Sequence, residues 1–200
     1  PLLLSIPLLL LAFIFFSGNR FTSLNLTLWL TGSAALVAAF YIPSNTWISL
    51  KRKISLFLRS PQVTLRITPW SVLVFLAIVL VVFFRFYRLS EVPGEMFSDH
   101  AEKLMDVAEV LQGQTAIFFP RNTGREAVQM YLTALIAILA GTKLSFMSLK
   151  IGTALAGVFT LPFIYLLGKE VGGKRVALFA FVLAGVAYWA NVISRIGLRF

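Results

Sequence analysis

Long runs of apolar residues dominate the chain. They cover residues 1–16, 23–42, 70–87, 127–142, 148–168 and 176–194. A helix needs roughly 20 residues, within a range of about 17–25, to cross the hydrocarbon core of a bilayer. Every run except 127–142 reaches this length if the first extends beyond Pro1, and none carries a charge at its centre. The pattern predicts an all-α polytopic membrane protein, here an N-terminal fragment of a longer chain.

A different periodicity runs from residue 98 to residue 113. Apolar residues recur there with helical spacing, and charged residues fill the other side. The apolar positions are Ala101, Leu104, Met105, Ala108 and Leu111, and the polar positions are Glu102, Lys103, Asp106 and Glu109. This predicts a surface helix of about three turns whose apolar side faces the membrane. Ser98 or Asp99 is expected to cap its start and Gly113 to end it.

Composition agrees with a membrane protein and excludes other classes. Hydrophobic residues make up 58% of the chain, against about 45–50% in soluble domains. The absence of cysteine excludes disulfides and thiolate chemistry, and a single histidine, His100, argues against a zinc site built from several histidines. The net charge is +10. Most cations flank apolar runs, where they orient helices and contact anionic lipid, so we exclude nucleic acid as a partner.

Charge also predicts the topology. Segment 43–69 is basic and carries no acid, so the positive-inside rule places it in the cytoplasm. Its basic residues are Lys51, Arg52, Lys53, Arg59 and Arg66. Segment 88–126 contains all but one of the chain's 8 acidic residues and is expected outside. Loop 168–175 is basic again and is expected inside. Run 127–142 therefore should not cross; it is expected to lie in the outer leaflet or to re-enter it.

Asp99 is the first candidate for chemistry. It follows an outward-running helix by about a dozen residues, which puts a carboxylate near the outer membrane face. With a reference pKa of about 3.9 it is ionised at neutral pH, and it can act as a general base toward an acceptor hydroxyl or amine. The alternative is an N-cap role, because Asp is a favoured capping residue.

Arg121 and Arg125 bracket a turn that contains Pro120, Asn122 and Gly124. Two guanidinium groups at headgroup level suit a lipid phosphate, which they can bind with bidentate hydrogen bonds. The alternatives are snorkelling of both side chains or ion pairs with a loop acid.

Five further residues are candidate site residues. They are His100, Glu102, Glu126, Arg195 and Arg199. His100 can bind a metal beside Asp99 or Glu102, or be a polar surface residue. The sequence identifies no metal ligands and no certain cofactor, and it leaves a requirement for a divalent metal open. Arg195 and Arg199 share one face if their helix continues, and they suit an anionic headgroup or serve as anchors.

Four segments in this order carry a family resemblance: "SDHAEKLMDVAEVLQGQ", "FFPRNTGREAVQMYLTAL", "LKIGTALAGVFTLPFIYLLGKEVGGKRVALFAFVLAG" and "ISRIGLRF". Together they resemble the N-terminal module of GT-C type membrane glycosyltransferases, and among these glycosyltransferase family 39, the protein mannosyltransferase and aminoarabinose transferase relatives. The resemblance covers about residues 70–200, with an outer loop at 88–147. Residues 1–69 add two helices and a basic cytoplasmic loop.

The resemblance implies a GT-C-like helix bundle with amphipathic surface helices in its first outer loop. It implies transfer of a hexose or pentose from a polyprenyl-phosphate donor to a glycan, lipid or protein acceptor, on the outer side of the cell membrane. Asp99 matches the motif's catalytic Asp. Arg125 stands where many relatives have a Lys that contacts the lipid phosphate. The chain departs from the pattern at His100, where relatives have Glu, and at Ala127, where they have Pro.

Two other functions compete with glycosyl transfer. A lipid or lipid-linked sugar transporter would favour charged residues at mid-membrane, which the apolar runs lack. A non-catalytic membrane subunit would account for the helices, but not for the acids and arginines concentrated in one outer loop.

Overall fold

The computed structural model describes residues 2–40, 55, 67–94, 96–121 and 124–198. Its two compact units are Pro1–Ile67 and Thr68–Phe200. The described residues form seven α-helices and one two-stranded sheet. Three of these helices are long and apolar enough to cross a membrane: Ser23–Phe40, Pro69–Phe86 and Phe146–Val186. The predicted helical, membrane-type architecture is therefore confirmed at this level. Arg199 and all five basic residues assigned to the cytoplasmic segment lie outside the described residues.

The first unit contains a helical hairpin. Helix α1 (Leu2–Phe15) and helix α2 (Ser23–Phe40) pack closely. Asn25 closes the turn between them, because its side-chain amide donates to the carbonyls of Phe15, at 3.2 Å, and Arg20, at 2.8 Å. Only α2 has the length of a membrane span, since the described part of α1 has 14 residues.

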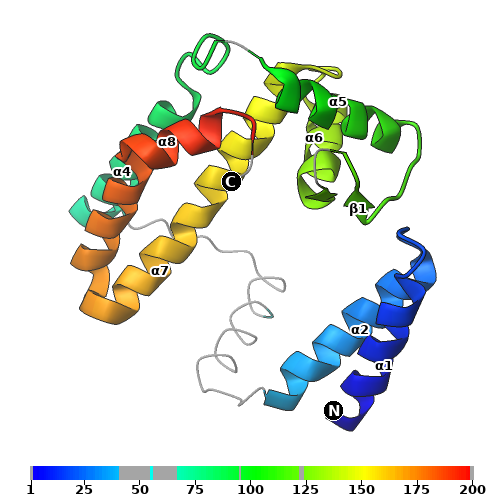
Figure 1. Cartoon of the computed structure of the whole chain (residues 1–200). Coiled ribbons are helices and arrows are strands. Elements are labelled where there is room, and N and C mark those ends of the chain that lie inside the picture. Colours follow the sequence, from blue (N-terminus) through cyan, green and yellow to red (C-terminus); the bar gives the residue numbers. More distant parts are fainter. Residues whose placement is uncertain (1, 41–54, 56–66, 95, 122–123, 199–200) are drawn as a thin grey trace. The chain divides into compact units, whose positions relative to one another are not determined.

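The core of the second unit is a long helical hairpin beside a third helix. Helix α7 (Phe146–Val186) contains non-helical residues at Gly172 and Gly173, and there the chain reverses (Figure 1). Gly173 has φ +75°, a conformation that glycine adopts without strain. The two arms then approach closely: a Cβ on Gly168 would lie 2.9 Å from the Ala177 Cα. The predicted reversal at 168–175 is thus confirmed.

Run 176–194 is not one straight helix, contrary to our expectation. The second arm of α7 ends at Val186, Ala187 has the extended ψ of 134°, and helix α8 (Tyr188–Arg195) follows. Arg195 is the last residue of α8, and Gly197 has φ +76°. The helix therefore ends at Arg195, so the condition under which Arg195 and Arg199 would share one face is not met.

The contacts at the two ends of helix α4 (Pro69–Phe86) define the two ends of this unit. At its start, the Lys174 ammonium lies 5.1 Å from the centre of the Trp70 ring, beside the reversal of α7. We call this end the turn end. Near its finish, Arg195 of α8 donates to the Phe84 carbonyl at 2.9 Å. We call that end the loop end. The start of α4 and the reversal of α7 therefore lie at the same end, as the predicted topology requires.

The segment between α4 and α7 forms a small layer at the loop end. It contains helix α5 (Ser98–Leu111), strands β1 (Phe118–Phe119) and β2 (Arg125–Glu126), and helix α6 (Val128–Leu139). The strands pair antiparallel around the predicted turn, which an all-helical interpretation did not include. Helix α6 has 12 residues and is about 18 Å long, too short for a hydrocarbon core of about 30 Å. By this length it does not cross, as predicted.

Candidate functional site

The first turn of α5 lies where α7 begins and α8 ends. The His100 ring lies 4.7 Å from the Phe146 ring, centre to centre. His100 Nε2 is 2.6 Å from the Ile196 carbonyl oxygen, although 96 positions separate the two residues along the chain. His100 is fully buried. It therefore joins α5 to the start of α7 and to the residue that follows α8.

His100 also supplies the cap of α5, which we had assigned to Ser98 or Asp99. The helix begins at Ser98, so Phe97 is the capping position. The Phe97 N–H donates to His100 Nδ1 at 3.2 Å. This leaves the proton on Nε2, which donates to Ile196. Imidazole takes the place that Glu has in a capping box, three residues after the cap, and Asp99 is not the capping residue.

Asp99 is the second residue of α5 and is partly exposed. The helix N-terminus carries a positive partial charge that favours a carboxylate there. Its neighbour His100 is oriented by two backbone groups and is close enough for the Asp99 charge to act on it. The arrangement presents a partly exposed carboxylate in the first turn of α5.

Arg121 and Arg125 are both paired with acids of α5. Arg121 binds Asp106 and Glu109, and Arg125 binds Asp106 at 2.9 Å and Glu102 at 2.6 Å. Asp106 is fully buried and Arg125 is 4% exposed. The hydrogen bond from Arg121 lowers the pKa of Glu109. The loop-acid alternative for these arginines is therefore the one observed, and their guanidinium groups fasten β2 and the preceding turn to α5.

These ion pairs turn the polar side of α5 toward the protein. Lys103 and Asp106 are buried, whereas Met105 is 54% exposed and Leu111 41% exposed. The apolar side is therefore on the outside, as expected of a helix that lies on a membrane. The opposite, charged side faces the protein, because the arginines of the strand layer pair with it. Gly113, with φ +96°, ends the helix as predicted.

Glu126 faces away from this network. Alternation along β2 buries Arg125 and exposes Glu126. Glu126 lines a groove of about 390 Å³ between α6 and α7. The remaining walls come from Val128, Gln129, Leu132, Gly152, Thr153 and Ala156. Glu126, Gln129 and Thr153 are the polar side chains among the lining residues.

Two cations at the loop end are held by neutral groups only. Lys150, 1% exposed, donates to the Pro93 carbonyl at 2.7 Å. Arg195 donates to the carbonyls of Phe84, Tyr87 and Val92. Within the described ranges neither residue forms an ion pair, and the buried Arg195 Nε has no hydrogen-bond partner. The sequence analysis missed Lys150, whose signal is a lysine inside the first turn of an apolar run.

A third cation, Arg85, is enclosed between α4 and the α7–α8 break. It is 2% exposed and donates to the Ser194 hydroxyl and the carbonyls of Ala184 and Ala190. The Ala184 carbonyl lies near the carboxyl end of α7, where the helix dipole favours a cation, and the Ala190 carbonyl lies in the first turn of α8. Arg85 therefore stabilises the break between the two helices and orients α8, which carries Arg195.

The neutral state of His100 gives a pH-dependent prediction. Burial is the largest influence on its pKa and lowers it, although the Ile196 carbonyl and the Asp99 charge act in the opposite direction. The unfolded chain then binds more protons, so the stabilisation is complete above about pH 6.5 and is lost as the pH falls below it. We expect the melting temperature of the protein to decrease between about pH 7 and pH 5.

The matched variant is His100→Gln, whose amide does not titrate. Its melting temperature should depend less on pH in the same interval, as measured by thermal unfolding in detergent. An identical pH dependence in both proteins would show that His100 is not the responsible group.

The described residues contain no group of three or more His, Asp or Glu side chains that could hold a metal ion. Both nitrogens of His100 contact backbone groups, so this ring offers no free lone pair to a metal in the observed arrangement. The first turn of α5, with Asp99 and His100, contacts Phe146 and Ile196 through the His100 ring. Lys150 lies over the Phe146 ring, and Arg195 precedes Ile196 in the chain. Arg121, Arg125 and Glu102 form the neighbouring ion-pair network, and Glu126 belongs to the groove between α6 and α7.

Comparison of the chain with protein-family models, with curated proteins and with solved structures found no match.

Proposed function

We propose that this chain is the N-terminal part of a GT-C-like membrane glycosyltransferase, in which Asp99 acts as general base. The donor is a sugar carried on a polyprenyl phosphate, and the loop end faces away from the cytoplasm in the cell membrane. The observation that carries the proposal is a partly exposed carboxylate in the first turn of α5, a turn that contacts the start of α7 and the end of α8 through His100. Those two elements carry Lys150 and Arg195, cations that have no carboxylate partner within the described residues. The resemblance of residues 70–200 to such enzymes supports the same reaction.

The proposal places the lipid phosphate on Lys150 and Arg195 rather than on Arg121 and Arg125. The latter two are already neutralised by acids, and removing them from those acids would leave buried charges unpaired. Lys150 and Arg195 donate only to neutral carbonyls, so their positive charge is available to an anion. The Arg195 charge also acts on Lys150, and an anion between them would relieve this repulsion.

In the proposed reaction, Asp99 accepts the proton of an acceptor hydroxyl or amine. The acceptor oxygen or nitrogen forms the new bond to the anomeric carbon as the bond from that carbon to the phosphate oxygen breaks, with inversion. Polyprenyl phosphate leaves with the bonding electron pair, and the two cations stabilise the charge that grows on it. The apolar side of α5, with Met105 exposed, would keep this turn at the membrane surface, where such a donor resides.

The full-length protein in proteoliposomes provides the test. Polyprenyl-phosphate hexoses and pentoses with a labelled sugar are added together with a cell-envelope extract as the source of acceptor. Release of free polyprenyl phosphate, with label passing to the extract, is the expected result. Movement of intact labelled lipid between leaflets without release would replace the proposal with a transporter. If no donor gives either release or movement, both the transferase and the transporter are contradicted.

A further inference from the structure

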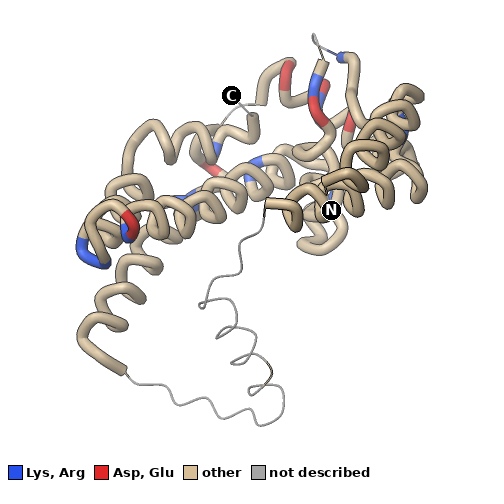
Figure 2. The backbone as a smooth tube through the Cα atoms, turned by 90° about the horizontal axis from the view of Figure 1, so that it is seen from below, with Lys and Arg blue, Asp and Glu red and all other residues tan. Residues whose placement is uncertain are grey.

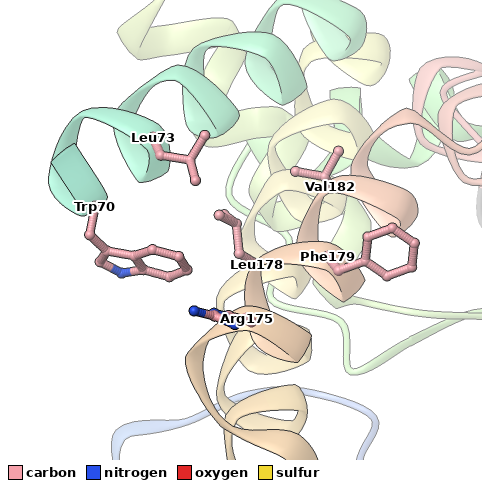
Figure 3. Close-up of a pocket in the computed structure, with 6 residues that line it drawn as sticks. All are labelled: Trp70, Leu73, Arg175, Leu178, Phe179 and Val182. Atoms are coloured by element: carbon pink, nitrogen blue, oxygen red, sulfur yellow. The ribbon is translucent and has the colours of Figure 1, made fainter.

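A second groove lies at the turn end, far along the bundle from the candidate site. It runs between the start of α4 and the second arm of α7 and has a volume of about 440 Å³. Its lining residues are Trp70, Leu73, Arg175, Leu178, Phe179 and Val182 (Figure 3). Arg175 is the only charged residue among them, and it lies across the groove from the Trp70 ring. The walls are otherwise hydrocarbon and aromatic.

The groove is polarised along its length. Arg175 lies at the end next to the α7 reversal, and Val182 lies seven residues further on, which is about 10 Å along a helix. The cavity volume falls within the range of about 300–1,000 Å³ that is usual for ligand sites. A matching ligand therefore has an anionic group at one end and an apolar chain behind it.

The basic residues around the groove are not neutralised by the protein. Lys169, Lys174 and Arg175 are accompanied by one acid, Glu170 (Figure 2). In the part of the chain that the structure describes, none of the three cations forms an ion pair, and Arg175 makes no hydrogen bond. The Lys174 ammonium lies over the Trp70 ring instead, which fixes both side chains at the mouth of the groove.

We propose that this groove binds an anionic glycerophospholipid. Its phosphate would accept hydrogen bonds from the Arg175 guanidinium, with Lys174 beside it, and one acyl chain would lie along Leu73, Leu178 and Val182. Trp70 at the start of an apolar helix is typical of the membrane–water interface, and a basic cluster there attracts anionic lipid. Charge complementarity and the polarity of the groove thus point to a lipid and not to a soluble anion. The inference does not depend on glycosyl transfer.

Native mass spectrometry of the delipidated full-length protein in detergent tests this site. The probes are phosphatidylglycerol and phosphatidylcholine with identical acyl chains. We expect phosphatidylglycerol to bind more tightly, and Arg175→Gln to weaken its binding about five-fold, the effect of one basic residue at an anionic surface. Leu73→Trp, which fills the groove, should weaken the binding of both lipids.

Lys169→Gln is the matched control, because it removes the same charge from the same turn but does not line the groove. It should change the affinity for phosphatidylglycerol much less than Arg175→Gln does. Equal effects of the two substitutions, or equal affinity of the unchanged protein for both lipids, would overturn the proposal. So would a dimer that Leu73→Trp dissociates, because a second copy would then occupy the groove. Helical circular dichroism of each variant identifies any that fails to fold.

Discussion

Replacing Asp99 with Asn is expected to lower the rate of polyprenyl phosphate release by about 10²–10⁴-fold, the usual contribution of a general base. Asn has nearly the same shape but cannot accept the proton of the acceptor. Because Asp99 is partly exposed and does not cap α5, the substitution should leave the fold intact. The measurement is the initial rate in proteoliposomes, compared at equal protein content.

The same substitution also tests a purely structural role of Asp99. A carboxylate in the first turn of a helix stabilises it by about 0.3–1 kcal/mol, so a structural Asp99 predicts a small decrease in melting temperature and an unchanged rate. Glu91→Gln is the matched control: it removes an acid from the same loop, where Glu91 pairs with Arg88 at the surface. Near-normal release by Asp99→Asn would refute the assignment of the base.

Replacing Arg125 with Met is expected to cause the largest loss of stability in the outer-loop layer. Removing one partner of a buried ion pair costs about 3–5 kcal/mol, because the remaining charge stays buried. We expect the low end of this range, since Asp106 keeps its pairing with Arg121. The measurements are thermal unfolding and hydrogen exchange, and amide protection should decrease most in α5 and β2.

Two further variants distinguish the effect of burial from the effect of the unpaired charge. Arg88→Met breaks an ion pair with Glu91 in which both side chains are 56% exposed, and it should cost at most about 1 kcal/mol. Adding Asp106→Leu to Arg125→Met removes the buried carboxylate, and it should recover part of the lost stability. Equal losses in Arg125→Met and Arg88→Met would show that burial does not strengthen the network.

Helix α5 illustrates how much of the fold can be predicted from the sequence. Its periodicity predicted its existence, its apolar side and its end at Gly113, because these depend on neighbours within one or two turns. The direction of its charged side was not predictable in the same way. A row of acids normally faces water, and only the approach of Arg121 and Arg125 from the strand layer reverses this.

The candidate site likewise combines a residue that the sequence identified with a residue that only the structure identified. Asp99 was identified from its place after an apolar run and from a resemblance, and its catalytic role stays a prediction. The signal of Lys150 was weak, because a single lysine in the first turn of an apolar run usually marks only the membrane interface. Its importance follows from its burial and from its bond to the Pro93 carbonyl, 57 positions earlier in the chain.

By itself, the sequence determined that most of this chain is helical and suited to a membrane. It also indicated that run 127–142 is shorter than the other apolar runs. A chain in lipid must satisfy its backbone within each helix, so length and composition of a run are sufficient for these conclusions. The tertiary structure decided which charges are neutralised, as in the pairing of Arg125 with Asp106, and which are not, as in Arg175. These contacts join residues on different elements, and no local pattern of residues encodes which side chains will meet.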